Sequence, residues 1–191
     1  MNNNVRIHNL TTQNLYVLNK KTIVHIISFY LAMFLGSAII FNIMYRLDYV
    51  PSGSMENTLR VSDYIFTNKI SYILKNEPQR GDIINFIAPD SREQYVKRVI
   101  GLPHETIWIR DGIIYVNDIP LNENYTIPFI AEDCGPFIVP ENEYFVLGDN
   151  RKNSYDSRYW NYKYVKKEDI LGKVIISFNT KDFRHTLYSL F

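Results

Sequence analysis

The most restrictive feature of this sequence is one long apolar run near its N-terminus. Residues 22–45 contain no Asp, Glu, Lys or Arg. As a helix rising ~1.5 Å per residue the run extends roughly 36 Å, whereas the hydrocarbon core of a bilayer is ~30 Å thick. It also exceeds the apolar region of a cleaved signal peptide, which is roughly 7–15 residues. We therefore expect one transmembrane helix, with a buried helix of a soluble protein as the alternative.

The charged residues that flank this run predict its orientation. Three basic residues precede the run and one follows it closely: Arg6, Lys20 and Lys21 before it, Arg46 after it. Basic flanks are enriched on the cytoplasmic side of a membrane. We expect residues 1–21 to be a cytoplasmic tail and residues 46–191 an extracytoplasmic domain, on a chain that crosses the plasma membrane once.

Composition narrows the class of the remaining domain. The whole chain has 191 residues and a hydrophobic content of 46%, which suit one medium-sized domain plus a small appendage. The formal net charge of +1 gives no electrostatic case for nucleic acid binding. The single cysteine, Cys134, excludes an intramolecular disulfide and a cysteine-based metal site.

Short apolar segments bounded by turn residues follow from about Tyr49 onward. The fifteen tyrosines and eleven phenylalanines of the chain also favour strands over helices. The strand candidates lie at residues 64–66, 82–87, 94–100, 143–147 and 172–178. Many short strands at this spacing predict a mainly β domain, an antiparallel barrel or sandwich.

Turn signals organise the middle of the domain. Asp111-Gly112 separates two β-rich segments within residues 106–116, the strongest short-range signal for a hairpin. Asn117-Asp118 predicts a second tight turn. The proline-containing stretch near 117–140 is interpreted as a looped insertion.

The segment Pro51-Ser52-Gly53-Ser54 follows the apolar run closely. Pro51 stiffens the entry to the segment, and Gly53 lets the backbone turn without a Cβ in the way. A serine on such a turn can present its hydroxyl and its own N–H to one carbonyl. The same pattern also occurs in solvated loops.

Lys97 lies in the middle of an apolar strand candidate. Strand alternation puts Tyr95 and Lys97 on one face and Val96 and Arg98 on the other. Because both faces are largely apolar, we expect either a poorly solvated amine or a side chain that extends to water. A desolvated lysine can act as a general base for a serine. No histidine has a context that marks it, so a Ser–Lys pair is more economical than a Ser–His–Asp triad.

A third polar segment, residues 148–158, follows another apolar strand candidate. It combines charged side chains with Asn and Ser groups: Asp149, Arg151, Lys152, Asp156 and Arg158 are its charged members. We expect two ion pairs, Arg151 with Asp149 and Arg158 with Asp156, that make the segment rigid. The alternative is a solvated surface turn.

Together these segments resemble the bacterial type I signal peptidase family, in its short single-span form. The resemblance is carried by PSGSM (51–55), YVKRVIGLP (95–103) and GDNRKNSYDSR (148–158), supported by SDYIFTNKISY (62–72) and QRGDIINF (79–86). It covers roughly residues 22–178. There are departures as well: Asn57 replaces a common proline, His104-Glu105 replaces Gly-Asp, and Lys152 stands where an acid is frequent.

The resemblance implies a role for each matching residue. Ser54 corresponds to the nucleophile and Lys97 to the general base. The Ser54 N–H and the Ser52 hydroxyl correspond to the oxyanion-binding pair, and Ser154 to a serine that hydrogen-bonds the lysine amine. Tyr95 and Val96 correspond to the pocket for the residue before the cut. The supporting loop residues are Asp149, Arg151, Asp156 and Arg158.

The implied function is a membrane-anchored Ser–Lys endopeptidase that removes signal peptides from exported preproteins. Its partners would be those preproteins and the lipid bilayer, and no metal or organic cofactor is implied. Two alternatives remain open. One is a relative with a single client such as a pilin, and the other is a non-catalytic assembly factor on the same fold.

Overall fold

The computed structural model describes residues 19–73, 76–126 and 133–179, and the backbone of residues 185–187. The chain consists of two compact units, Met1–Ile40 and Phe41–Phe191. Of the predicted tail, residues 1–21, all but the last three lie outside the described residues.

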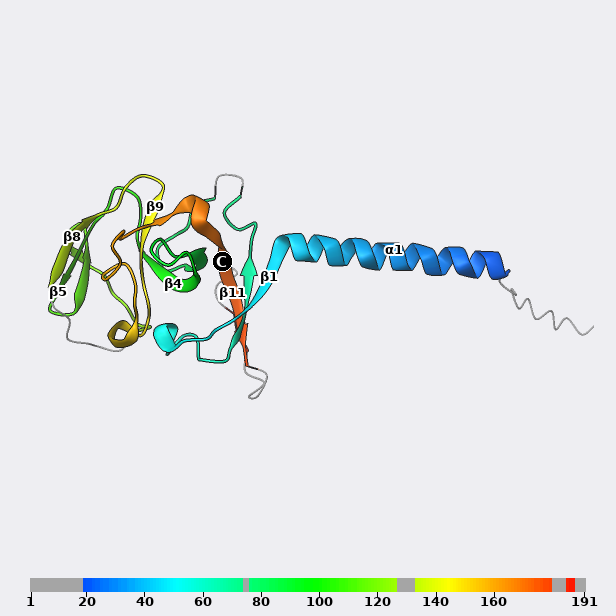
Figure 1. Ribbon diagram of the computed structural model, residues 1–191, viewed down its shortest axis with the longest axis horizontal. Coiled ribbons are helices and arrows are strands. Elements are labelled where there is room, and N and C mark those ends of the chain that lie inside the picture. The colour runs from blue at the N-terminus through cyan, green and yellow to red at the C-terminus, as the bar shows by residue number, and fades with distance from the viewer. Residues whose placement is uncertain (1–18, 74–75, 127–132, 180–184, 188–191) are drawn as a thin grey trace, which may run out of the picture. The chain divides into compact units, whose positions relative to one another are not determined.

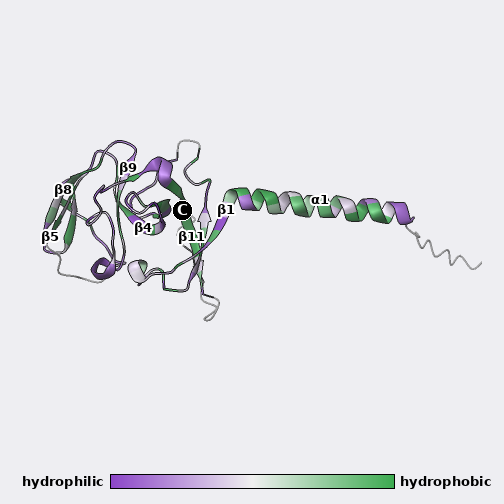
Figure 2. Cartoon of the chain, viewed as in Figure 1, coloured by the Kyte–Doolittle hydropathy of each residue, from purple (hydrophilic) through white to green (hydrophobic). Residues whose placement is uncertain are grey.

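Helix α1 (Lys20–Met44) occupies the apolar run. The Asn19 carboxamide oxygen accepts a hydrogen bond from the Lys21 N–H at 3.2 Å and so caps the N-terminus. None of its residues is buried, and hydrophobic residues (green) occupy most of its length (Figure 2). By length and composition the helix can cross a membrane. Strand β1 begins at Tyr45, directly after the helix, where no strand was predicted.

The larger sheet has the order β1-β2-β11-β3-β4-β9-β10, with β12 paired to β11. Figure 1 labels four of its strands, β1, β4, β9 and β11. Its strands are β1 (Tyr45–Tyr49), β2 (Tyr64–Asn68), β3 (Ile83–Ile87), β4 (Gln94–Gly101), β9 (Glu143–Leu147), β10 (Val165–Lys166), β11 (Ile170–Phe178) and β12 (His185–Leu187). The pairs between neighbouring strands are antiparallel. The mainly β, antiparallel fold with one N-terminal apolar helix is therefore confirmed.

The smaller sheet has the order β7-β6-β5-β8. Its strands are β5 (Thr106–Arg110), β6 (Ile113–Val116), β7 (Ile119–Pro120) and β8 (Cys134–Ile138). The predicted hairpin joins β5 to β6: Asp111 has φ 51° and Gly112 has φ 75°, as a two-residue turn of this type requires. Asn117 and Asp118 form the second turn, with φ values of 50° and 63°.

The interpretation of residues 117–140 as a looped insertion was wrong for β7 and β8. Strand β8 pairs with β5, and Phe137 stacks on Phe145 at 4.8 Å between ring centroids. The prolines were misleading because β8 is an edge strand, where a residue without an N–H is tolerated. Residues 127–132 of this stretch lie outside the described part of the chain.

Three clusters of buried apolar side chains form the core. The first lies around Phe86 and Trp160, and the second joins the two sheets through Ile107 and Phe145. The third contains Val50, Met55, Leu59, Ile65, Ile83 and Val174. This third cluster holds the segment around Ser54 in place, because residues on both sides of the serine are buried in it.

A bulge in β11 depends on Gly172. The register between β11 and β3 shifts at this residue, which has φ 153°. A Cβ there would lie 2.3 Å from the Asn68 carbonyl oxygen. Only glycine allows β11 to approach β2 this closely.

We predict that Gly172→Ala destabilises the domain more than Gly81→Ala does. Gly81 also has a positive φ, 91°, but a Cβ there would meet nothing within 4 Å. The backbone collision at Gly172 should add ~1–3 kcal/mol, the usual cost of overpacking. Urea unfolding of both variants measures the difference, and equal losses would show that the strand moves aside freely.

Candidate active site

A short 3₁₀ turn, η1 (Gly53–Met55), presents Ser54. Ser52 precedes it in an extended conformation with φ −130°. Met55 is 1% exposed, and its carbonyl accepts the Leu59 N–H at 2.7 Å. The turn is therefore fixed from beneath by the core, while the hydroxyl of Ser54 stays on the surface of a cleft.

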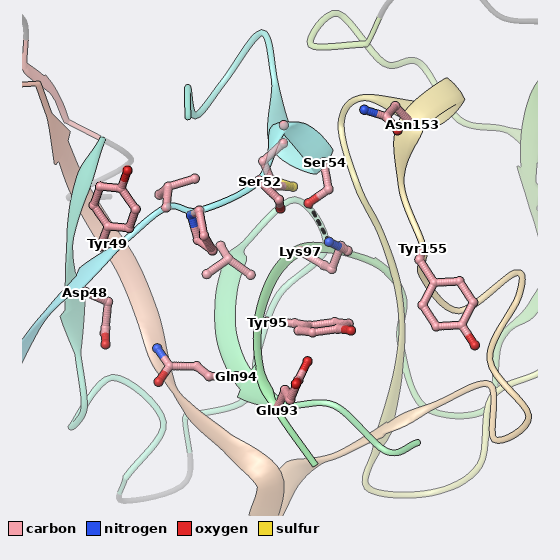
Figure 3. A pocket seen from close by; sticks show the side chains of 15 residues that line it. Asp48, Tyr49, Ser52, Ser54, Glu93, Gln94, Tyr95, Lys97, Asn153 and Tyr155 are labelled. Carbon is pink, nitrogen blue, oxygen red and sulfur yellow. Dashed lines mark hydrogen bonds between the residues drawn. The ribbon is translucent and has the colours of Figure 1, made fainter. Parts of the chain in front are cut away.

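Lys97 lies on β4 and is 4% exposed. Its Nζ atom lies 2.6 Å from the Ser54 Oγ atom, within hydrogen-bond distance (Figure 3). Burial lowers the pKa of Lys97 to about 8, although the carboxylates of Asp156 and Asp149 act in the opposite direction. The amine is thus held close to a serine hydroxyl in a site that favours its neutral form.

The cleft beside this pair has a volume of about 570 Å³. Residues 48–55 form one wall and residues 93–97, at the start of β4, form another, with Asn153 and Tyr155 completing the lining. Tyr95, Val96 and Ser52, which the sequence placed at the site, all lie on these walls. Figure 3 shows the Ser52 side chain next to Ser54.

The loop after β9 contacts the serine turn through its backbone. The Asn150 N–H donates to the Ser54 carbonyl at 3.1 Å, and the Asn150 carboxamide donates to the Gly53 carbonyl at 3.0 Å. A Cβ at Gly148 would lie 2.4 Å from the Ser54 carbonyl oxygen and 2.2 Å from the Ser154 Oγ atom. The absence of a side chain at Gly148 thus lets the loop and the turn meet.

The predicted ion pair between Arg158 and Asp156 is present in the structure. Two hydrogen bonds of 2.8 and 2.9 Å join the guanidinium and the carboxylate, and both side chains are nearly inaccessible to solvent. Asp156 also accepts the Gly148 N–H at 3.0 Å. The pair therefore fixes the backbone at the glycine that touches the serine turn.

The predicted pair between Arg151 and Asp149 was wrong. Asp149 instead accepts two hydrogen bonds from Arg98, at 2.8 and 2.6 Å. Arg151 donates to the Gly148 carbonyl at 3.0 Å and forms its ion pair with Glu123. The side chains of Asp149 and Arg151 point in different directions. Each pairs with a residue that is distant in the sequence.

Four supporting residues were not found from the sequence. Thr58 donates to Asp149 at 2.5 Å, and the Arg98 guanidinium lies 3.9 Å from the centre of the Tyr125 ring. The sequence could have indicated a role for Arg98, because it is a second charged residue, next to Lys97, in an apolar strand. Thr58, Glu123 and Tyr125 had none, because their contacts join segments distant in the sequence.

Ser154 is buried, but the structure does not show the hydrogen bond to Lys97 that the resemblance implied. Its hydroxyl has no hydrogen-bond partner among the described residues, and Lys97 is bonded to Ser54 instead. The Ser154 Oγ atom lies against Gly148, close to the serine turn.

The departures from the family pattern have local structural consequences. Asn57 has φ 87°, a value that the ring of proline cannot adopt. His104 has φ 69°, occupies a glycine position of the family pattern, and is exposed outside the cleft lining. Glu105 binds Arg80 at 2.9 and 2.5 Å, and Lys152 is exposed.

Within the described residues, no group of three or more His, Cys, Asp or Glu side chains could hold a metal ion.

We predict that Asp156→Ala strongly destabilises the domain. The variant leaves the buried Arg158 without its carboxylate, which typically costs ~3–5 kcal/mol. The matched control is Arg92→Ala, which removes one partner of a pair with Asp169 whose arginine is 67% exposed. Exposed pairs contribute at most ~1 kcal/mol. Thermal unfolding compares the two, and similar midpoints would contradict a buried supporting role for Asp156.

Comparisons with known proteins agree with these features. The family model described as signal peptidase, peptidase S26, matches residues 20–179. A probable signal peptidase I-2 of Synechocystis is 43% identical over 136 residues, which cover 68% of this chain and 61% of that protein. A signal peptidase I of Leptolyngbya laminosa is 44% identical over 138 residues, covering 68% and 66%.

The match thus spans about two thirds or less of the length of these two relatives. A crystal structure of a signal peptidase I from Enterococcus faecalis has 41% sequence identity and a TM-score of 0.41, covering 51% of this chain and 97% of that one. The family match, by contrast, extends from the first turn of α1 to the end of β11. The chain therefore belongs to the signal peptidase family, peptidase S26.

Proposed function

We propose that this protein is a membrane-anchored serine endopeptidase that removes N-terminal signal peptides from exported preproteins. The observation that carries the proposal is the 2.6 Å contact between the Ser54 hydroxyl and the buried Lys97 amine. It lies in an open cleft of a chain that belongs to the signal peptidase family. The relatives described above are named signal peptidases.

Ser54 is the proposed nucleophile and Lys97 its general base. The neutral amine takes the hydroxyl proton as the Ser54 Oγ atom attacks the scissile carbonyl carbon. The resulting ammonium gives this proton to the leaving amine, so that an ester to Ser54 remains. Lys97 then takes a proton from water as the water oxygen attacks the ester carbonyl carbon. The ammonium returns this proton to the Ser54 Oγ atom as the ester bond breaks, which releases the acid product and restores the neutral amine.

The oxyanion of each tetrahedral intermediate would be bound by the Ser54 N–H and the Ser52 hydroxyl. The Ser52 side chain lies on the cleft beside Ser54, which supports this role. Ser154 is the proposed support of the lysine, since its buried hydroxyl has no other partner among the described residues. The loop residues Asp149, Arg151, Asp156 and Arg158 would hold the turn in place.

The substrate would lie extended in the cleft beside β4 and bind through its backbone. Tyr95 and Val96 would line the pocket for the residue before the cut, and both are on the cleft wall. Small pockets on this wall would admit the small side chains found one and three residues before the cut in signal peptides.

Helix α1 would anchor the enzyme in the plasma membrane, with residues 1–21 in the cytoplasm and the domain of residues 46–191 outside. Its length and apolar surface support the anchor, and the basic residues before it support the orientation. Cleavage of several unrelated preproteins in detergent tests the function, because an enzyme with one client would cleave only one of them.

Ser54→Ala should abolish cleavage without unfolding the domain, because only one hydroxyl is lost. Ser52→Ala should retain weak activity, since the loss of one oxyanion donor lowers rates by ~10²–10³. Both are measured with one preprotein in detergent, with folding checked by circular dichroism. A folded Ser54→Ala enzyme that still cleaves would exclude the proposed nucleophile.

Lys97→Arg should be inactive although it keeps the charge, because a guanidinium stays protonated across the working pH range. In the unchanged enzyme, kcat/KM should rise with pH through an apparent pKa near the value of about 8 that burial gives Lys97. Near-normal turnover by a folded Lys97→Arg enzyme would exclude Lys97 as the base.

The same pKa also has a consequence for stability. The folded state releases the Lys97 proton near pH 8, whereas the unfolded chain holds it to about pH 10.4. Between these values the unfolded chain binds more protons, so the free energy of unfolding should rise with pH. In urea unfolding experiments at a series of pH values, the Lys97→Met variant should lack the increase in the free energy of unfolding that Lys97 causes over this pH range.

The proposed topology predicts that protease added to intact spheroplasts degrades the domain. The basic residues before α1 favour a cytoplasmic N-terminus, so the domain should be accessible from outside. Immunoblotting against the C-terminal region measures its loss. Complete protection until the cells are lysed would reverse the orientation.

A further inference from the structure

The end of the cleft farthest from the Ser54–Lys97 pair is built from β1 and the start of β4. Arg46 on β1 donates to Asp48 at 2.6 Å and to Gln94 on β4 at 2.6 Å. Strands β1 and β4 are not neighbours in the sheet, so this contact requires the sheet to curl. Arg46 thereby fixes the separation of the two walls at this end.

This end of the cleft carries one negative charge more than its ion pairs neutralise. Asp48 is paired with Arg46 and also accepts the Asn85 carboxamide N–H at 2.9 Å. Glu93, at the edge of β4, lines the cleft and is exposed. Among the described residues its carboxylate has no ion pair or hydrogen bond, and the adjacent Arg92 is paired with Asp169 at 3.1 Å. Glu93 therefore supplies an unpaired negative charge to the cleft.

The distance along β4 indicates which part of a substrate would meet this charge. Residues in a strand are ~3.3 Å apart, so Glu93 lies three residues, roughly 10 Å, along the chain from Val96. Val96 would line the pocket for the first residue before the cut. An extended substrate whose preceding residues run beside β4 would therefore reach Glu93 at about the fourth residue before the cut. This alignment rests on the proposed function.

We propose that Glu93 is a specificity-determining residue that favours preproteins with a basic side chain at the fourth residue before the cut. A lysine or arginine there would approach the unpaired carboxylate. An acidic residue at the same position would be repelled, and it would find Arg46 already bound to Asp48 and Gln94.

The test uses three versions of one preprotein, with Lys, Gln or Glu at the fourth residue before the cut, and kcat/KM in detergent at low ionic strength. The unchanged enzyme should prefer Lys over Gln by about two- to fivefold, the range for an exposed ion pair, and should cleave the Glu version least. Glu93→Gln should bring the Lys-to-Gln ratio to about 1. Glu93→Lys should reverse the order of the Lys and Glu versions. Added salt should reduce the preference of the unchanged enzyme.

The matched control is Glu168→Gln, which removes an exposed carboxylate that does not line this cleft. It should keep the ratio of the unchanged enzyme. An unchanged enzyme that cleaves all three versions equally, or a Glu93→Gln enzyme that keeps the original ratio, overturns the inference about Glu93. Failure to cleave any of the three versions would instead contradict the proposed function.

Discussion

The paired hydrogen bonds between Arg98 and Asp149 connect strand β4, which carries Lys97, to the loop after β9, which contacts the turn that carries Ser54. Arg98 is next to Lys97 on β4, and strand alternation directs the two side chains to opposite faces. Asp149 lies in the loop after β9, and the next residue, Asn150, binds the turn that carries Ser54. A shift of β4 would therefore move the lysine and the loop together, which keeps the distance between Lys97 and Ser54 constant.

This arrangement also explains how a lysine can be buried beside two carboxylates. Asp149 and Asp156 both act to raise the pKa of Lys97, yet burial has the larger effect. Each carboxylate is already bound to an arginine, Arg98 or Arg158, and these pairs have N–O distances of 2.6 and 2.8 Å. The loop can therefore be strongly ionic without stabilising the charged form of the amine enough to overcome its desolvation.

The sequence predicted those features whose cause is local. The Asp111-Gly112 turn and the position of Lys97 on β4 depend on a few adjacent residues, and both agree with the structure. The partner of Arg151 depends on tertiary packing, which brings Glu123 to it from 28 residues away. Strand β8 was missed because its proline is acceptable only at the edge of a sheet, and edge position is a property of the whole fold.

Because α1 continues directly into β1, the distance between the end of the helix and Ser54 is limited. The helix ends at Met44, and Ser54 follows ten residues later. A fully extended chain of this length spans at most roughly 36 Å. In the proposed topology, with Met44 near the bilayer surface, the nucleophile cannot work farther than this from the membrane. The tether would thus act as a ruler, selecting scissile bonds close to a membrane-embedded segment of the precursor and sparing similar sequences in the exported domain beyond it.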